Sequence, residues 1–121
     1  MSTVKVTYFD KAAVRRALDD FVRRLAADHP EVETVIVFGS LASGTPVPGS
    51  DVDLVVVLTD SDRRFIDRIP TFLPAHFPVP VDVFPYTRAE VERMTREGNP
   101  FVKRALREGM TLFERSPAAG H

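Results

Sequence analysis

The chain has 121 residues, which is enough for one hydrophobic core but not for two. Its 16 Lys and Arg residues nearly balance its 17 Asp and Glu residues, so the composition indicates no nucleic-acid-binding surface and we expect no DNA partner. The absence of Cys excludes disulfides and thiol chemistry and fits a cytoplasmic protein, and no apolar stretch approaches the length of a membrane span.

The first half of the chain predicts a helix followed by two strands. Apolar residues at helical spacing from 14 to 25 predict an amphipathic helix, with Asp10 as its N-cap. Residues 34–38 are rich in Val and Ile and predict the first strand. After a Gly-Ser turn and a loop rich in Pro and Gly, residues 52–59 predict a second strand. This strand is apolar on both faces, as expected of a central strand.

The second half predicts helices around one more strand. Asp60 or Ser61 is the expected cap of a helix that Pro70 should kink or break. Residues 79–84 predict a third strand, and Pro80 favours its place at a sheet edge. The remaining predicted elements are a helix opened by the capping box of Thr87 and Glu90, a helix from Pro100 to about Glu108, and a short strand over 111–114. We expect one domain over 1–115 and a disordered tail over 116–121.

Three aspartates stand out against the apolar strands. Asp51 and Asp53 open the second strand, and because side chains alternate along a strand, both project from the same face. Asp82 lies within the third predicted strand. Like charges held close together repel, and a hard divalent cation with oxygen ligands removes the repulsion. Mg²⁺ prefers one or two carboxylates together with substrate phosphates, so the pattern indicates a magnesium site.

Gly39 and Ser40 follow the first strand directly. This turn can begin a helix whose free N–H groups face an anion, with the Ser40 hydroxyl as a further donor. Taken singly, such a turn is more often only a turn, and an Asp-x-Asp pair is more often a solvated strand end. The joint spacing between apolar strands favours a phosphate cradle beside a metal site, which is typical of phosphoryl or nucleotidyl transfer.

The pattern of Gly39-Ser40, ten residues, Asp51-x-Asp53 and then Asp82 resembles the signature of the nucleotidyltransferase superfamily that includes DNA polymerase β. The short chain is most similar to the minimal nucleotidyltransferases (MNT), which act as antitoxins to HEPN-domain toxins. The resemblance covers about residues 9–115. It implies an α/β (α+β) nucleotidyltransferase fold, with a mixed β-sheet and helices packed mainly on one face.

The resemblance also implies roles for single residues. Asp51, Asp53 and Asp82 would be the catalytic and metal-binding residues, holding two Mg²⁺ ions or Mn²⁺, with ATP as the substrate. Asp82 would also help to activate the attacking hydroxyl. Many relatives place an Arg within the first turn after the Gly-Ser pair, where this chain has Leu-Ala-Ser. The residues that would bind the nucleotide are Gly39, Ser40 and Ser50.

The expected function is therefore Mg²⁺-dependent transfer of AMP from ATP to a hydroxyl, by analogy a Tyr, of a partner HEPN toxin in a hetero-oligomer. Larger relatives carry an added helical domain for their acceptor, so we expect a partner protein to supply the acceptor here. Two alternatives stay open. The chain could be a non-catalytic antitoxin that neutralises a HEPN ribonuclease toxin by binding alone, or a small-molecule transferase that modifies an antibiotic.

Overall fold

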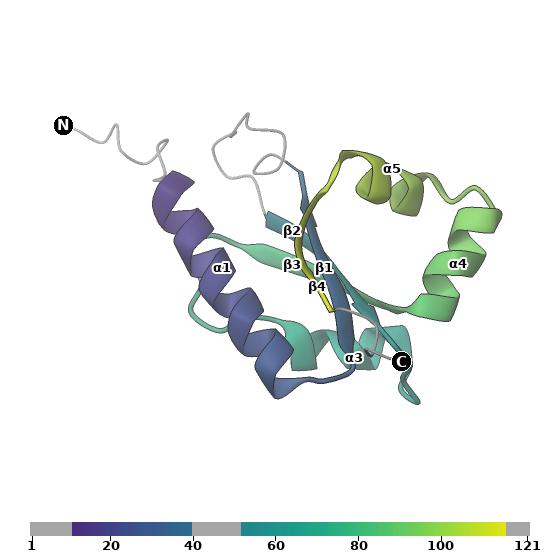
Figure 1. Ribbon diagram of the computed structural model, residues 1–121, viewed down its shortest axis with the longest axis horizontal. Helices are drawn as coiled ribbons and strands as arrows, with labels where there is room; N and C mark the ends of the chain where they lie inside the picture. The colour runs from purple at the N-terminus through teal and green to yellow at the C-terminus, as the bar shows by residue number, and fades with distance from the viewer. Residues whose placement is uncertain (1–10, 40–51, 116–121) are drawn as a thin grey trace.

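The computed structural model describes residues 11–39 and 52–115. Their strands form one mixed sheet in the order β3-β2-β1-β4, flanked by helices (Figure 1). This confirms the predicted α+β fold with a mixed sheet. The elements in chain order are α1 (Lys11–Asp28), β1 (Val32–Phe38), β2 (Val52–Leu58), α3 (Phe65–Phe72), β3 (Val81–Thr87), α4 (Arg88–Arg96), α5 (Pro100–Glu108) and β4 (Met110–Glu114).

β2 is a central strand of the sheet, as its sequence predicts. It pairs antiparallel with β1 on one side and parallel with β3 on the other. All of its side chains are buried except that of Asp53, which is half-buried. β4 completes the sheet by pairing antiparallel with the far side of β1.

Helices cover both faces of the sheet. The larger cluster lies under α1 and α3 and includes Leu18, Leu54 and Phe72. A smaller cluster lies under α4 and α5 and includes Ile36, Val55 and Ala105. Figure 1 shows α1 on one side of the sheet and α4 with α5 on the other. Helices therefore cover both faces of the sheet, and the larger cluster lies on the face covered by α1 and α3. None of the helices in the described part of the chain is long and apolar enough to cross a membrane.

The third strand is longer at its end than the sequence predicts. The predicted strand stopped at residue 84, but β3 begins at Val81 and continues through Pro85 to Thr87. Proline has no N–H to donate and is tolerated where that position faces away from the neighbouring strand. β3 is at an edge of the sheet, with β2 as its neighbour, so Pro85 does not interrupt the ladder.

The predicted cap of α3 was wrong. The Asp60 carboxylate accepts a hydrogen bond from the Ser61 N–H, and the Ser61 hydroxyl accepts one from the Arg63 N–H. Both side chains therefore close a turn ahead of the helix. The helix itself begins at Phe65 after an N-cap residue without a side-chain cap. It runs through Pro70 to Phe72, so the proline does not break it.

The junction between β3 and α4 is fixed by the predicted capping box. The Thr87 hydroxyl accepts a hydrogen bond from the Glu90 N–H, and the Glu90 carboxylate accepts one from the Thr87 N–H. The same carboxylate also forms an ion pair with Arg68 of α3. Arg68 Nη1 donates to Oε1 at 2.7 Å and Nη2 donates to Oε2 at 3.1 Å. These bonds, chiefly the one from Arg68, hold the pKa of Glu90 below its ordinary value of 4.5.

Replacing Glu90 by Gln should therefore destabilise the fold in a pH-dependent way. Because the folded pKa is lower than the unfolded one, the ion pair contributes fully above the unfolded value and loses its contribution as the pH falls through the folded value. Urea unfolding should show a clear difference in unfolding free energy between wild type and Glu90→Gln at about pH 7, and a much smaller one at about pH 3. An equal difference at both pH values would contradict this assignment.

Arg115 fastens the end of β4 to α1 and β1. Its Nε donates to the Val32 carbonyl and its Nη2 to the Ala26 carbonyl in the last turn of α1, both at 3.0 Å. Arg115→Ala should lower the unfolding free energy by about 1–2 kcal/mol, because two hydrogen bonds from a charged donor are lost. Arg104→Ala is the matched control, since an exposed ion pair such as Arg104–Glu108 contributes little to stability. Equal losses in both variants, measured by urea unfolding, would contradict a fastening role for Arg115.

Candidate active site

Asp53 and Asp82 lie opposite each other on neighbouring strands. In the parallel pairing of β2 with β3, Asp53 is the register partner of Asp82. Register partners project to the same face, and neighbouring strands are about 4.8 Å apart. Both residues also take part in interactions within the fold, and Asp53 is half-buried whereas Asp82 is exposed. The structure therefore brings together two of the three predicted carboxylates.

The predicted Gly turn lies beside these carboxylates. Phe38, the last residue of β1, is the register partner of Asp53, and Gly39 follows it directly. Gly39 has a φ of 95°, a left-handed conformation that residues with a Cβ rarely adopt. The end of β1 and the starts of β2 and β3 thus meet at one end of the sheet, with Gly39, Asp53 and Asp82 together.

The other predicted site residues, Ser40, Ser50 and Asp51, lie outside the described residues. Within residues 11–39 and 52–115, no group of three or more His, Cys, Asp or Glu side chains could hold a metal ion. Two carboxylates from neighbouring strands, facing one side, still fit the oxygen donors that Mg²⁺ takes alongside substrate phosphates. The predicted third carboxylate, Asp51, is two residues before Asp53 in the sequence.

Three half-buried phenylalanines lie beside the carboxylates on the same sheet face. Phe101 of α5 packs against Phe38 and Phe84, with ring centroids 5.2 and 4.8 Å apart. Phe84 follows Asp82 by two residues and so shares its face. Alternation along β3 predicts the place of Phe84, but no pattern in the sequence indicates that Phe101 joins it. Apolar side chains at this position lower the local dielectric constant and so strengthen the attraction between a carboxylate and a cation.

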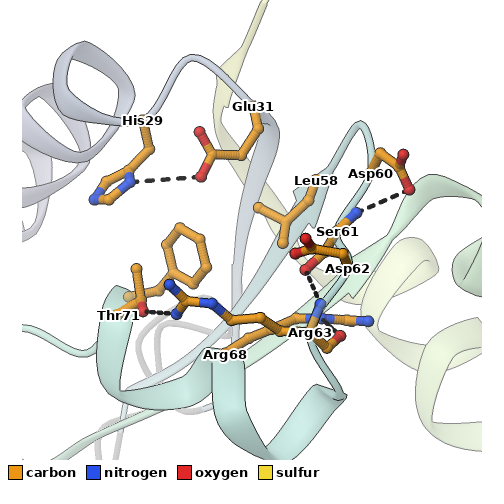
Figure 2. A pocket seen from close by; sticks show the side chains of 10 residues that line it. His29, Glu31, Leu58, Asp60, Ser61, Asp62, Arg63, Arg68 and Thr71 are labelled. Carbon is orange, nitrogen blue, oxygen red and sulfur yellow. Dashed lines mark hydrogen bonds and ion pairs between the residues drawn. The ribbon is translucent and has the colours of Figure 1, made fainter.

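A hollow of about 360 Å³ lies at the other end of the sheet. It is lined by Leu58 at the end of β2, about 16 Å along the strand from Asp53, and by polar side chains (Figure 2). Several of these side chains contact one another. His29 Nδ1 lies 3.5 Å from Glu31 Oε2, and Arg63 Nη1 donates to the Thr71 hydroxyl at 2.9 Å. Neither Asp53 nor Asp82 lines this hollow, so its volume does not describe the space around the carboxylate pair.

A protein-family model described as a nucleotidyltransferase domain matches residues 18–112. This chain belongs to that family. The match includes the end of β1, the carboxylate strands β2 and β3, and the helices on both faces of the sheet. Membership agrees with the arrangement of Gly39, Asp53 and Asp82 at one end of the sheet.

Similar proteins come from a sequence comparison and from solved structures. A protein of Methanocaldococcus jannaschii, named as a candidate protein adenylyltransferase, is 37% identical over 60 residues, which are 49% of this chain and 41% of that protein. This nucleotidyltransferase domain thus covers less than half of that relative. A candidate nucleotidyltransferase from Sulfolobus solfataricus shares the fold with a TM-score of 0.61 and 20% identity, over 87% of this chain and 84% of the other.

One chain of a toxin–antitoxin complex with AMP-PNP also shares this fold. Its TM-score is 0.55 and its identity 19%, over 81% of this chain and 74% of that one. A chain of a variant of the toxin–antitoxin pair MntA–HpeT has a TM-score of 0.54 and 18% identity, over 82% and 73% of the two chains. At these identities the likeness concerns the fold of the nucleotidyltransferase domain.

Metal and nucleotide should stabilise this protein together. With ATP present, millimolar Mg²⁺ or Mn²⁺ should raise the melting temperature, since a ligand at about 100 times its Kd adds about 2.7 kcal/mol to the unfolding free energy. Asp82→Asn should remove most of this rise, whereas Asp62→Asn in the distant hollow should keep it. A thermal shift assay that finds no rise in wild type would count against a metal site at Asp53 and Asp82.

Proposed function

We propose that this protein is a Mg²⁺-dependent adenylyltransferase that transfers AMP from ATP to a tyrosine hydroxyl of a HEPN-domain toxin and so acts as its antitoxin. The observation that carries the proposal is the register pairing of Asp53 with Asp82 next to Gly39, in a chain of the nucleotidyltransferase domain family. The relative named as a candidate protein adenylyltransferase supports a protein substrate, and the toxin–antitoxin structures that share the fold support a toxin as the partner.

The proposed reaction makes one bond to phosphorus and breaks another. The tyrosine oxygen bonds to the α-phosphorus of ATP, the bond from that phosphorus to the bridging oxygen breaks, and pyrophosphate leaves. Asp82 accepts the tyrosine proton, since it is the exposed member of the pair and the one on the edge strand. Gly39, without a Cβ, lets the backbone approach the phosphates closely.

The metal ligands in this proposal are Asp51, Asp53 and Asp82. Bound magnesium would supply positive charge against the triphosphate and the leaving pyrophosphate. The chain's own part is to fix the ligands: Asp53 sits in a central strand with buried neighbours on both sides, so its position is set by the core. A rigid strand holds such a ligand more accurately than a loop does.

Adenylylation would inactivate the toxin by charge and bulk. An AMP group adds a negative charge to a neutral hydroxyl. Near the catalytic residues of a ribonuclease, this charge would repel the phosphates of RNA and its bulk would block access. The antitoxin effect would then need only one transfer to each toxin chain and would outlast the complex of the two proteins.

The test is co-expression of this protein with a HEPN toxin, followed by intact mass measurement of the toxin. The toxin should gain mass in adenylate steps with wild type and with Asp62→Asn, and should gain none with Asp53→Asn. The mutation keeps the size of the side chain, and circular dichroism should confirm that the variant is folded.

Two outcomes would overturn the proposal. If Asp53→Asn neutralises the toxin fully without any mass gain, the protein acts by binding alone. If the toxin is never modified but an aminoglycoside acquires label from ATP, the substrate is a small molecule. Transfer to the toxin at the wild-type rate by Asp53→Asn would mean that the metal assignment is wrong.

A further inference from the structure

The strand that carries Asp82 is less supported than the one that carries Asp53. β3 is an edge strand with β2 as its neighbour in the sheet, whereas β2 has β3 and β1 on its two sides. A one-residue slip of such a strand would move Asp82 to the opposite face, away from Asp53. Contacts on the outer side of β3 would oppose such a slip.

Arg68 of α3 makes that contact. Its side chain reaches the outer edge of β3 and is buried, with 4% of the residue exposed. Nη1 donates to the Pro85 carbonyl at 3.0 Å, and Nε donates to the Arg63 carbonyl at 2.9 Å. Figure 2 shows Arg68 extending from α3, with Arg63 beside it. One guanidinium thus joins the helix to the side of β3 that faces away from β2.

Glu90 completes this attachment from the next element. Its carboxylate binds Nη1 and Nη2 of Arg68, and it also accepts the Thr87 N–H at the last residue of β3. The ion pair therefore contacts β3 at two places, residues 85 and 87, and leaves the inner side of the strand to β2. These contacts lie three to five residues beyond Asp82 on the same strand.

Stability alone is a weak reason for such a pair. Taking an Arg and a Glu out of water costs much of what their attraction returns, and an uncharged replacement is often as stable or more stable. The pair does provide a fixed geometry, because the N–H groups of a planar guanidinium point in fixed directions and so fix where the carboxylate and carbonyl partners lie. The arrangement here fixes β3 against α3 and α4.

We propose that Arg68 is a positioning residue which, through the Pro85 carbonyl and Glu90, holds β3 in the register that places Asp82 opposite Asp53. Arg68 does not touch the substrate and acts only through the strand. This inference rests on the proposed metal site at the two aspartates. Its consequence is that the metal affinity of the site depends on an ion pair on the outer edge of the sheet.

The test uses a double variant, Arg68→Met with Glu90→Gln. It leaves no buried charge unpaired, and Gln keeps an acceptor for the Thr87 N–H. The readout is the Kd of Mn²⁺, measured by calorimetry on the full chain with a non-hydrolysable ATP analogue, well below each melting temperature. We expect Mn²⁺ binding at least tenfold weaker than in wild type. Arg115→Ala, which loses hydrogen bonds far from β3, is the control and should bind within twofold of wild type.

A second variant keeps the test decisive if the double variant does not fold. Arg68→Lys retains a positive charge beside Glu90 but cannot match the fork that reaches the carboxylate and the Pro85 carbonyl together. It should weaken Mn²⁺ binding several-fold. Wild-type affinity in the folded double variant or in Arg68→Lys would overturn the positioning role. An equal loss in Arg115→Ala would also overturn it, because the effect would then be general destabilisation.

Failure of the metal site, and with it of the proposed function, gives a different result. Wild type would then bind Mn²⁺ no more tightly than the analogue does in a titration without protein, and Asp53→Asn would behave like wild type. That outcome would overturn the metal site and the positioning role with it. Tight binding in wild type that is lost in Asp53→Asn but kept in the Arg68 variants would overturn the positioning role alone.

Discussion

The parallel pairing of β2 with β3 is the constraint on which the candidate site depends. It aligns Asp53 with Asp82, two residues that are 29 positions apart in the sequence. The position of β2 in this pairing is specified by burial, since Val55 and Val57 of β2 must face the cluster under α4 and α5 while Leu54 faces the cluster under α1 and α3. With both of its faces buried, β2 cannot shift by one residue without exposing apolar side chains.

The two carboxylate strands are held in different ways, and this difference bears on function. Asp53 stands in a strand fixed by neighbours on both sides and by the core. Among the described strands Asp82 stands at the edge, where the Arg68–Glu90 pair contacts the outer side of β3. The site thus has one ligand on a strand with neighbours on both sides and one on a strand held by β2 on one side and by polar contacts on the other. Substitutions far from the carboxylates can then alter metal affinity through β3.

Much of this fold can be predicted from local patterns. Apolar periodicity and the capping box of Thr87 and Glu90 predict the elements, and apolar residues on both faces predict that β2 is central. The end of β3 and the start of α3 were missed for physical reasons. Pro85 stays in the ladder because its strand is an edge, and Asp60 and Ser61 close a turn instead of capping the helix. Both outcomes depend on tertiary context that a single sequence does not contain.

The candidate site, like the fold, could be predicted from the sequence only in part. Motif spacing predicts Gly39, Asp53 and Asp82, and the structure places these three at one end of the sheet. The predictions for Ser40, Ser50 and Asp51 stay predictions, since these residues lie outside the described part of the chain. Phe101 and Arg68 could not be predicted, because they reach β1 and β3 from α5 and α3 through contacts with no local signature.

The most direct measurement is anomalous X-ray scattering from crystals grown with Mn²⁺ and a non-hydrolysable ATP analogue. We expect a manganese peak at coordination distance, about 2.1 Å, from carboxylate oxygens of both Asp53 and Asp82. A peak bound elsewhere, or nucleotide bound with no metal between these two side chains, would contradict it.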